Sequence, residues 1–129
     1  MTRDPAWALQ TSVFETLCAH PDLSQDFIFD RVPNDTPLPW IVIGNDTLFA
    51  EYEAANLTRA NVTIDVFAAT KKQLKLLIGA VRSSLDRNLD IQGYLCGEGQ
   101  WDETQYVTEP DGKTQHAVMS FDYLLFPTE

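Results

Sequence analysis

The sequence predicts an α+β protein in which two helices pack on one face of a two-layer, largely antiparallel sheet. Two segments carry apolar residues at helical spacing, and several others alternate apolar and polar residues as strands do. The predicted order is helix, three strands, helix and three further strands, in one domain over residues 1–129.

The first helix is predicted from about Pro5 to Ala19. Asp4 can cap its first free N–H groups, and proline is tolerated at the first helical position. The apolar residues recur at helical spacing, as Ala6, Leu9, Val13 and Leu17. The helix is expected to end at His20-Pro21, because the residue before a proline is pushed out of the α region.

The next segment predicts a short strand from Phe27 to Val32, followed by an extended connection rich in proline, Pro33–Pro39. Proline lacks a donor N–H and is tolerated at strand starts but not in central strands. The next strand is therefore expected to begin at Trp40 and to end at Ile43 or Gly44. Residues 45–59 then form a long acidic connector, and loops of that length in small domains are usually functional or mobile.

The middle of the chain carries the clearest patterns. ANVTIDVFA alternates without interruption and predicts a strand, and TKKQLKLLIGAVRSSLDRNLD predicts a helix. Thr70 and Gln73 form a capping box at its start. Its apolar stripe consists of Leu74, Leu77, Ile78, Val81 and Leu85. Five of the nine basic residues lie on the other faces of this helix. They form either a solvated helix face or a basic docking surface.

The last third predicts antiparallel strands. Strands over residues 91–96 and 101–108 are separated by Gly97 and Gly99, which break or bulge the sheet there. Pro110-Asp111-Gly112 has the composition of a tight turn. The final strand, QHAVMSFDYLLF, places five residues on one face: Ala117, Met119, Phe121, Tyr123 and Leu125.

Charge and composition narrow the function classes. The formal net charge is −10, and a chain this acidic is repelled by phosphate backbones, which argues against a nucleic-acid-binding protein. No apolar run is long enough for a membrane span, and the first residues lack the apolar core of a signal peptide, so a cytoplasmic origin is expected. Cys18 and Cys96 are expected to be free, structural thiols.

The chain offers no motif for catalysis, and no catalytic, cofactor-binding or metal-binding residue is predicted. Its glycines between residues 93 and 99 lie between strands rather than before a helix, so they form no phosphate loop. Cys18 and His20 are two residues apart at a helix end and point to different faces. Asp65 interrupts a strong strand, and the alternation assigns it to the solvent face.

Four segments of the chain have a recognisable combination of features: WALQTSVFETLCAHPDL, FDRVPNDTPLPWIVIGND, NVTIDVFAATKKQLKLLIGAVRSSLD and EPDGKTQHAVMSFDYLLF. Together they resemble the tail-terminator, or tail-completion, proteins of long-tailed phages and gene transfer agents. They cover most of the chain in the family's order. The segments NDTLFAEYEAANLTR and LCGEGQWDETQYV depart from the family's pattern and are plausible ring or partner surfaces.

The resemblance implies a structural protein of the virion tail or neck, assembled in the host cytoplasm. Such proteins form a six-fold ring at the head-proximal end of the tail tube. The ring ends tube polymerisation and gives the head connector or stopper protein a docking surface, and DNA passes through it without specific binding. The expected interface residues are Leu48, Phe49 and Tyr52 in the acidic connector and Lys71, Lys72 and Lys75 on the second helix.

Three other functions fit the residues. One is a head–tail stopper or adaptor, which has the same kind of partners. Another is a small cytoplasmic ligand-binding or regulatory domain, favoured by a monomer with a closed apolar pocket. The third is a metal-dependent enzyme, which requires several carboxylates to converge in one cleft.

Overall fold

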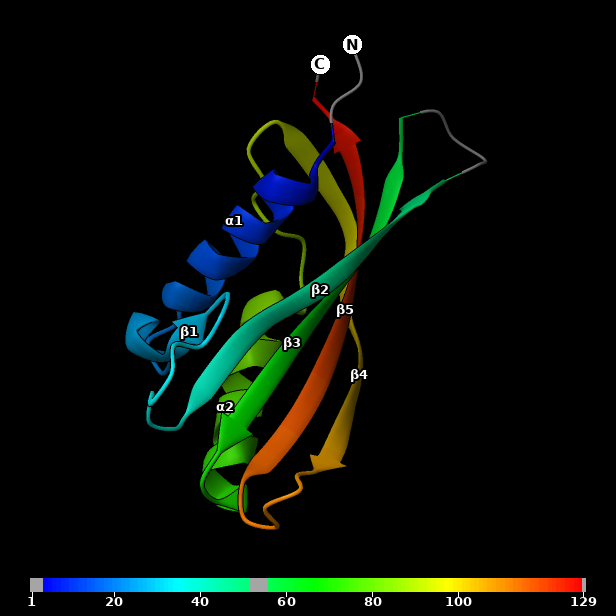
Figure 1. Ribbon diagram of the computed structural model, residues 1–129. Coiled ribbons are helices and arrows are strands. Elements are labelled where there is room, and N and C mark those ends of the chain that lie inside the picture. Colours follow the sequence, from blue (N-terminus) through cyan, green and yellow to red (C-terminus); the bar gives the residue numbers. More distant parts are fainter. Residues whose placement is uncertain (1–3, 52–55, 129) are drawn as a thin grey trace.

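The computed structural model describes residues 4–51 and 56–128. Its elements are α1 (Ala6–Cys18), a 3-10 helix (Gln25–Phe27), β1 (Ile28–Phe29), β2 (Trp40–Ala50), β3 (Thr58–Ala68), α2 (Lys71–Leu85), β4 (Tyr94–Thr108) and β5 (Gln115–Pro127). The strands form one sheet in the order β1-β2-β3-β5-β4, antiparallel except between β1 and β2. Both helices pack on one face, which confirms the predicted α+β class (Figure 1).

The core lies between the helices and one face of the two central strands. β3 and β5 bury every second side chain, and all five predicted residues of β5 are buried. α1 contributes Leu9, Val13 and Leu17, and α2 contributes Leu74, Leu77, Val81 and Leu85. Burial of a side chain of this size stabilises the fold by roughly 1.5–3 kcal/mol, so these faces determine the packing of the two layers.

The helix starts follow the predicted caps. The carboxylate of Asp4 accepts a hydrogen bond from the Ala6 N–H at 2.8 Å. The Thr70 hydroxyl accepts one from the Gln73 N–H, and the Gln73 side chain accepts one from the Ala69 N–H, both at 3.1 Å. The predicted helix from residue 70 to residue 90, however, is too long, because α2 ends at Leu85. The residues after it bind β4 instead: Asp86 accepts from the Trp101 N–H and Asn88 from the Gly99 N–H, both at 2.8 Å.

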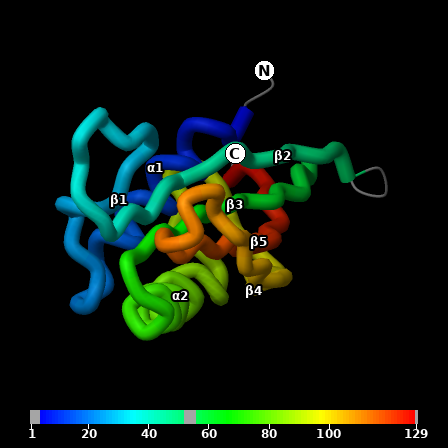
Figure 2. Tube along the Cα trace, turned by 60° about the horizontal axis from the view of Figure 1, so that its bottom comes forward, coloured from blue at the N-terminus to red at the C-terminus, as the bar shows by residue number. Residues whose placement is uncertain are grey.

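The predicted connector over residues 45–59 is wrong. β2 continues to Ala50 and β3 begins at Thr58, so most of this segment belongs to a long hairpin. The register shifts between Ile43 and Asp46, and this bulge at Gly44 and Asn45 turns Asp46 and Leu48 toward the helix side. Pairing with β3 overrides the low strand propensity of an acidic sequence. Figure 2 shows this end of the hairpin extending away from the rest of the chain.

Two further strand predictions need correction. The expected strand from Phe27 to Val32 is reduced to β1, because the Ser24 side chain accepts from the Asp26 N–H and caps a 3-10 turn over the first residue. The expected strands over residues 91–96 and 101–108 are one strand, β4. Its register shifts between Gly97 and Gln100 and again after Trp101, so the glycines bulge the strand without breaking it.

No helix within residues 4–51 and 56–128 covers the other face of the sheet (Figure 1). Its centre is polar: the Asn61 amide donates to the Ser120 hydroxyl at 2.6 Å and to the Asp122 carboxylate at 2.8 Å. Toward the start of β2 it becomes aromatic, where the ring of Phe67 lies 5.4 Å from Trp40 and 4.0 Å from His116. The open face is therefore held together by its own cross-strand contacts.

Candidate functional site

The predicted interface residues lie at two opposite ends of the sheet (Figure 1). Leu48 and Phe49 lie near the end of β2, in the projecting hairpin, whereas Lys71, Lys72 and Lys75 lie in the first turns of α2. Tyr52 falls outside the described residues. The structure thus does not bring the two predicted groups together within one subunit.

The hairpin end consists of Phe49, Glu51, Arg59 and Glu98. The Phe49 side chain is 50% exposed, and it lies opposite Arg59 of the neighbouring strand β3. The Arg59 guanidinium lies 2.9 Å from the Glu51 carboxylate and 3.6 Å from that of Glu98, so it joins the hairpin to the start of β4. Leu48 points to the helix side and is partly buried against the core.

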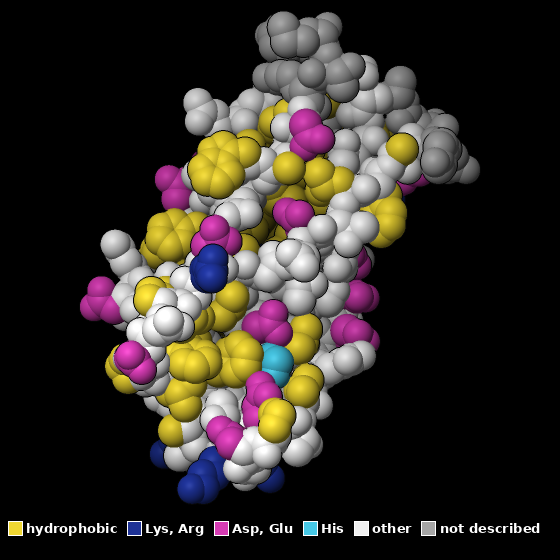
Figure 3. All heavy atoms as spheres, in the orientation of Figure 1, with side chains coloured by type: hydrophobic (Ala, Val, Ile, Leu, Met, Phe, Trp, Pro, Cys, Tyr) yellow, Lys and Arg dark blue, Asp and Glu magenta, His cyan; other side chains and the backbone are white. Residues whose placement is uncertain are grey.

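The lysine end consists of Lys71, Lys72, Lys75 and Lys113, which are all the lysines of the chain. Figure 3 shows a group of basic side chains at the end of the molecule where α2 begins. None of these lysines forms an ion pair with any residue in 4–51 or 56–128. All four lysines are exposed, although the chain carries 19 acidic residues.

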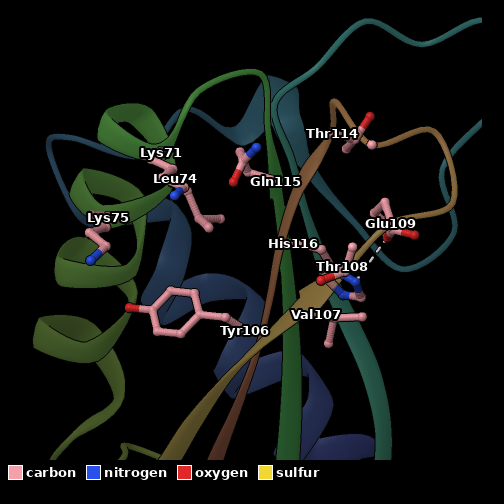
Figure 4. A pocket seen from close by; sticks show the side chains of 11 residues that line it. Lys71, Leu74, Lys75, Tyr106, Val107, Thr108, Glu109, Thr114, Gln115 and His116 are labelled. Carbon is pink, nitrogen blue, oxygen red and sulfur yellow. Dashed lines mark ion pairs between the residues drawn. The ribbon is translucent and has the colours of Figure 1, made fainter.

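A cavity of about 320 Å³ opens between α2 and the end of the β4–β5 hairpin. Leu74 forms part of its wall, and Tyr106 points from β4 toward α2, as Figure 4 shows. Tyr106 pairs with the buried Ala117 but is itself 59% exposed, because α2 does not cover this part of β4. The Lys75 ammonium lies 5.4 Å from the centre of the Tyr106 ring, a cation–π contact.

The hairpin turn at the lysine end holds its own carboxylate. The Asp111 side chain accepts hydrogen bonds from the Thr114 hydroxyl and from the N–H groups of Lys113 and Thr114. These bonds, the Thr114 hydroxyl first, lower the pKa of Asp111 to about 2. The Asp111 carboxylate is thus hydrogen-bonded to groups of its own turn.

Sequence reasoning missed a cluster around His116 on the open face. Its Nε2 lies 2.8 Å from the Asp65 carboxylate, and its Nδ1 lies 2.9 Å from the Glu109 carboxylate without hydrogen-bonding geometry. The alternation placed Asp65 on the correct face, but no local signal indicates a partner 51 residues away. The imidazole lies between Asp65 of β3 and Glu109, which follows β4 next to the hairpin turn, so we expect it to stabilise this end of the sheet.

His116→Phe should test this structural role. The substitution keeps an aromatic ring against Phe67 and removes both contacts with carboxylates. We expect the free energy of unfolding to fall by about 1–3 kcal/mol, the usual cost of leaving a half-buried charged group without its partner. Urea unfolding at pH 7 measures it, with Val118→Ala on the same face as the control. A loss below about 0.5 kcal/mol for His116→Phe would show that the contacts do not stabilise the fold.

Neither cysteine is placed for chemistry. Cys18 and Cys96 are both free, as predicted, and burial raises the pKa of each thiol. Within residues 4–51 and 56–128, no group of three or more His, Cys, Asp or Glu side chains is arranged to hold a metal ion. None of the described helices is long and apolar enough to cross a membrane.

The exposed aromatic at one end of the sheet can anchor a protein contact, and the exposed lysines around the cavity at the other end can attract an acidic partner. The model of the family described as tail completion protein gp17 matches residues 11–125, so the chain belongs to that family. It is therefore a structural component of a virion tail and not an enzyme.

A solved structure gives the same fold. A chain in the structure titled "Virion of native gene transfer agent (GTA) particle" matches with a TM-score of 0.80 and 19% identity, over 97% of this chain and 99% of that chain. No curated protein matches the chain in sequence. The resemblance predicted from the four sequence segments is thus confirmed at the level of family and fold.

Proposed function

We propose that this chain forms a closed six-fold ring at the head-proximal end of the tail tube. The ring ends tube polymerisation and offers the head connector or stopper protein a surface on which to dock. The family match over residues 11–125 carries the proposal, because completing a tail requires a protein that binds the end of the tube. The similarity to a chain of a gene transfer agent virion supports it at the level of the fold.

A closed ring requires heterologous contacts, in which two different surfaces of neighbouring subunits meet. The chain has exposed, chemically different surfaces at its two ends, which suits such a contact. The net charge of −10 suits an annulus through which DNA slides without specific binding. The proposed partners are other copies of this chain, the tail tube protein and the connector.

The exposed Phe49 provides the test of this function. Because half of the side chain is already in solvent, Phe49→Ala should lower the free energy of unfolding by less than about 1 kcal/mol. If Phe49 contacts a neighbouring subunit or the tube, the variant should assemble poorly and leave tails of uncontrolled length. Thermal unfolding and negative-stain images of rings and tail ends measure the two effects on one protein.

The control is Phe14→Ala, which removes an aromatic of the same type that is 37% exposed on the outer side of α1. It should leave ring formation and tail length unchanged. Rings and tails of normal length from Phe49→Ala would remove Phe49 from the interface. Tails that end at their normal length in the complete absence of the protein would refute the terminator function itself.

A further inference from the structure

The lysine end lies on the surface of a strongly acidic protein, and this raises the question of what it binds. Four lysines that form no ion pair within residues 4–51 and 56–128 surround or adjoin a cavity whose wall includes Leu74 and the exposed ring of Tyr106. Such a surface fits an acidic segment that carries an apolar side chain, because the lysines attract its carboxylates and the cavity receives the apolar group.

The described residues contain a surface of that kind at the opposite end of the sheet. At the hairpin end, Phe49 is 50% exposed, and Glu51 and Glu98 lie around Arg59. This end offers one aromatic side chain among carboxylates, and the lysine end offers a cavity among ammonium groups. The two ends of one chain point away from each other (Figure 1), so they can meet only between copies.

We propose that the lysine end of one copy receives the hairpin end of the next copy, with Phe49 entering the cavity beside Tyr106. This inference rests on the proposed ring and names its contact. Identical copies with a net charge of −10 repel one another unless basic and acidic surfaces meet, and this pairing brings such surfaces together. The contact joins two different surfaces, as a closed ring requires.

Duplex DNA is the other polyanion that could reach the lysines. An extended phosphate backbone at the lysine end would run on over the rest of the acidic surface, which repels it. It would also leave the apolar wall of the cavity without an apolar partner. A protein segment that carries carboxylates and an apolar side chain can contact both the lysines and the apolar wall of the cavity.

A pair of single variants with the same change in charge provides the first measurement. Lys75→Glu reverses a charge at the cavity, and Arg31→Glu reverses an exposed charge in the segment before β2. We expect Lys75→Glu to raise the concentration at half-assembly at least about tenfold and Arg31→Glu to leave it unchanged. Sedimentation velocity over a concentration series gives these values, and circular dichroism shows that both variants fold.

A mixing experiment identifies the two surfaces. Lys71→Glu/Lys75→Glu damages only the lysine end, and Phe49→Lys damages only the hairpin end. Each variant alone should remain monomeric. When they are mixed, the intact hairpin end of the first should bind the intact lysine end of the second and give a 1:1 dimer that cannot grow. This dimer should weaken as the salt concentration rises.

The outcomes separate this inference from the proposed function. Rings from the lysine variants would overturn the inference and leave the ring intact. Two monomeric variants that give no dimer on mixing would also overturn it. Salt-sensitive binding of duplex DNA that Lys75→Glu abolishes would assign the lysines to DNA instead. Unsubstituted protein that stays monomeric both in solution and on tail ends would overturn the ring and the inference together.

Discussion

Gly99→Ala is expected to lower the free energy of unfolding by about 3 kcal/mol or more, at the upper end of the cost of overpacking. The position has no room for a side chain. An added Cβ would overlap the carbonyl oxygen of Arg87, and it would lie 2.6 Å from the Arg87 carbonyl carbon and 2.8 Å from the Asn88 nitrogen. All three neighbours are backbone atoms, which cannot move aside as a flexible side chain can.

The close approach at Gly99 holds the bulged part of β4 against the segment that follows α2. The Gly99 N–H donates to the Asn88 side chain at 2.8 Å, and an alanine would push the strand away from this acceptor. Loss of the contact would also strain the neighbouring hydrogen bond from the Trp101 N–H to Asp86. The substitution therefore costs packing and hydrogen bonding together.

Gly97→Ala is the matched control, two residues away on the same strand. A Cβ at Gly97 would meet no heavy atom within 4 Å. Alanine also restricts the unfolded chain, so this variant should be as stable as the unsubstituted chain or up to about 1 kcal/mol more stable. Urea unfolding of both variants measures the difference. Equal stabilities would mean that β4 does not approach the Arg87–Asn88 backbone as described.

Tyr123→Phe is expected to lower the free energy of unfolding by about 1–3 kcal/mol at pH 7. The Tyr123 hydroxyl is buried and donates a 2.7 Å hydrogen bond to the Leu85 carbonyl, at the last residue of α2. The Leu85 carbonyl is one of the last carbonyl groups of α2, which have no hydrogen-bond partner within the helix. Phenylalanine fills the same space but leaves the carbonyl unsatisfied in the core.

The same substitution should change the response to alkali. Burial is the main cause that raises the pKa of Tyr123 above its ordinary value. The contribution of Tyr123 to stability is therefore complete below the unfolded pKa of about 10 and is lost as the pH rises above it, by about 1.4 kcal/mol per pH unit. The phenylalanine variant lacks this loss, so the gap between the two proteins should narrow as the pH rises from 10 to 11.

Urea unfolding at pH 7, 10 and 11 measures both effects of Tyr123→Phe. Tyr106→Phe serves as the control at pH 7, because the Tyr106 side chain is 59% exposed. It should stay within about 0.5 kcal/mol of the unsubstituted chain. A gap for Tyr123→Phe that stays constant up to pH 11 would contradict the role assigned to the buried hydroxyl.

The elements with uninterrupted periodicity were predictable from the sequence. β3 and β5 bury the residues that their patterns select, and α2 buries its predicted stripe except Ile78, which is partly buried. The capping box of α2 forms at Thr70 and Gln73 as predicted. Here local pattern and tertiary packing agree. The proline before Trp40 likewise marked the start of β2 correctly, because proline cannot take part in a central strand.

The remaining features depend on contacts that a local pattern does not contain. The acidic residues after Gly44 lie in a strand because β3 pairs with them, and their composition gives no sign of it. The bulges of β4 replace a predicted break because Asp86 and Asn88 bind the strand from another element. The cavity at the lysine end joins residues of α2 to residues of the β4–β5 hairpin, which only the fold brings together.

The pairing of β3 with β5 at the centre of the sheet has a consequence for how the chain is made. Ala68 pairs with Gln115 and Thr58 with Leu125, so the central ladder joins segments far apart in the chain. During synthesis β3 leaves the ribosome well before β5. The edge of β3 that pairs with β5 therefore has no partner strand while α2 and β4 are translated. An unfinished chain thus has no complete sheet for α2 to cover, and it cannot enter an assembly before its last strand has been made.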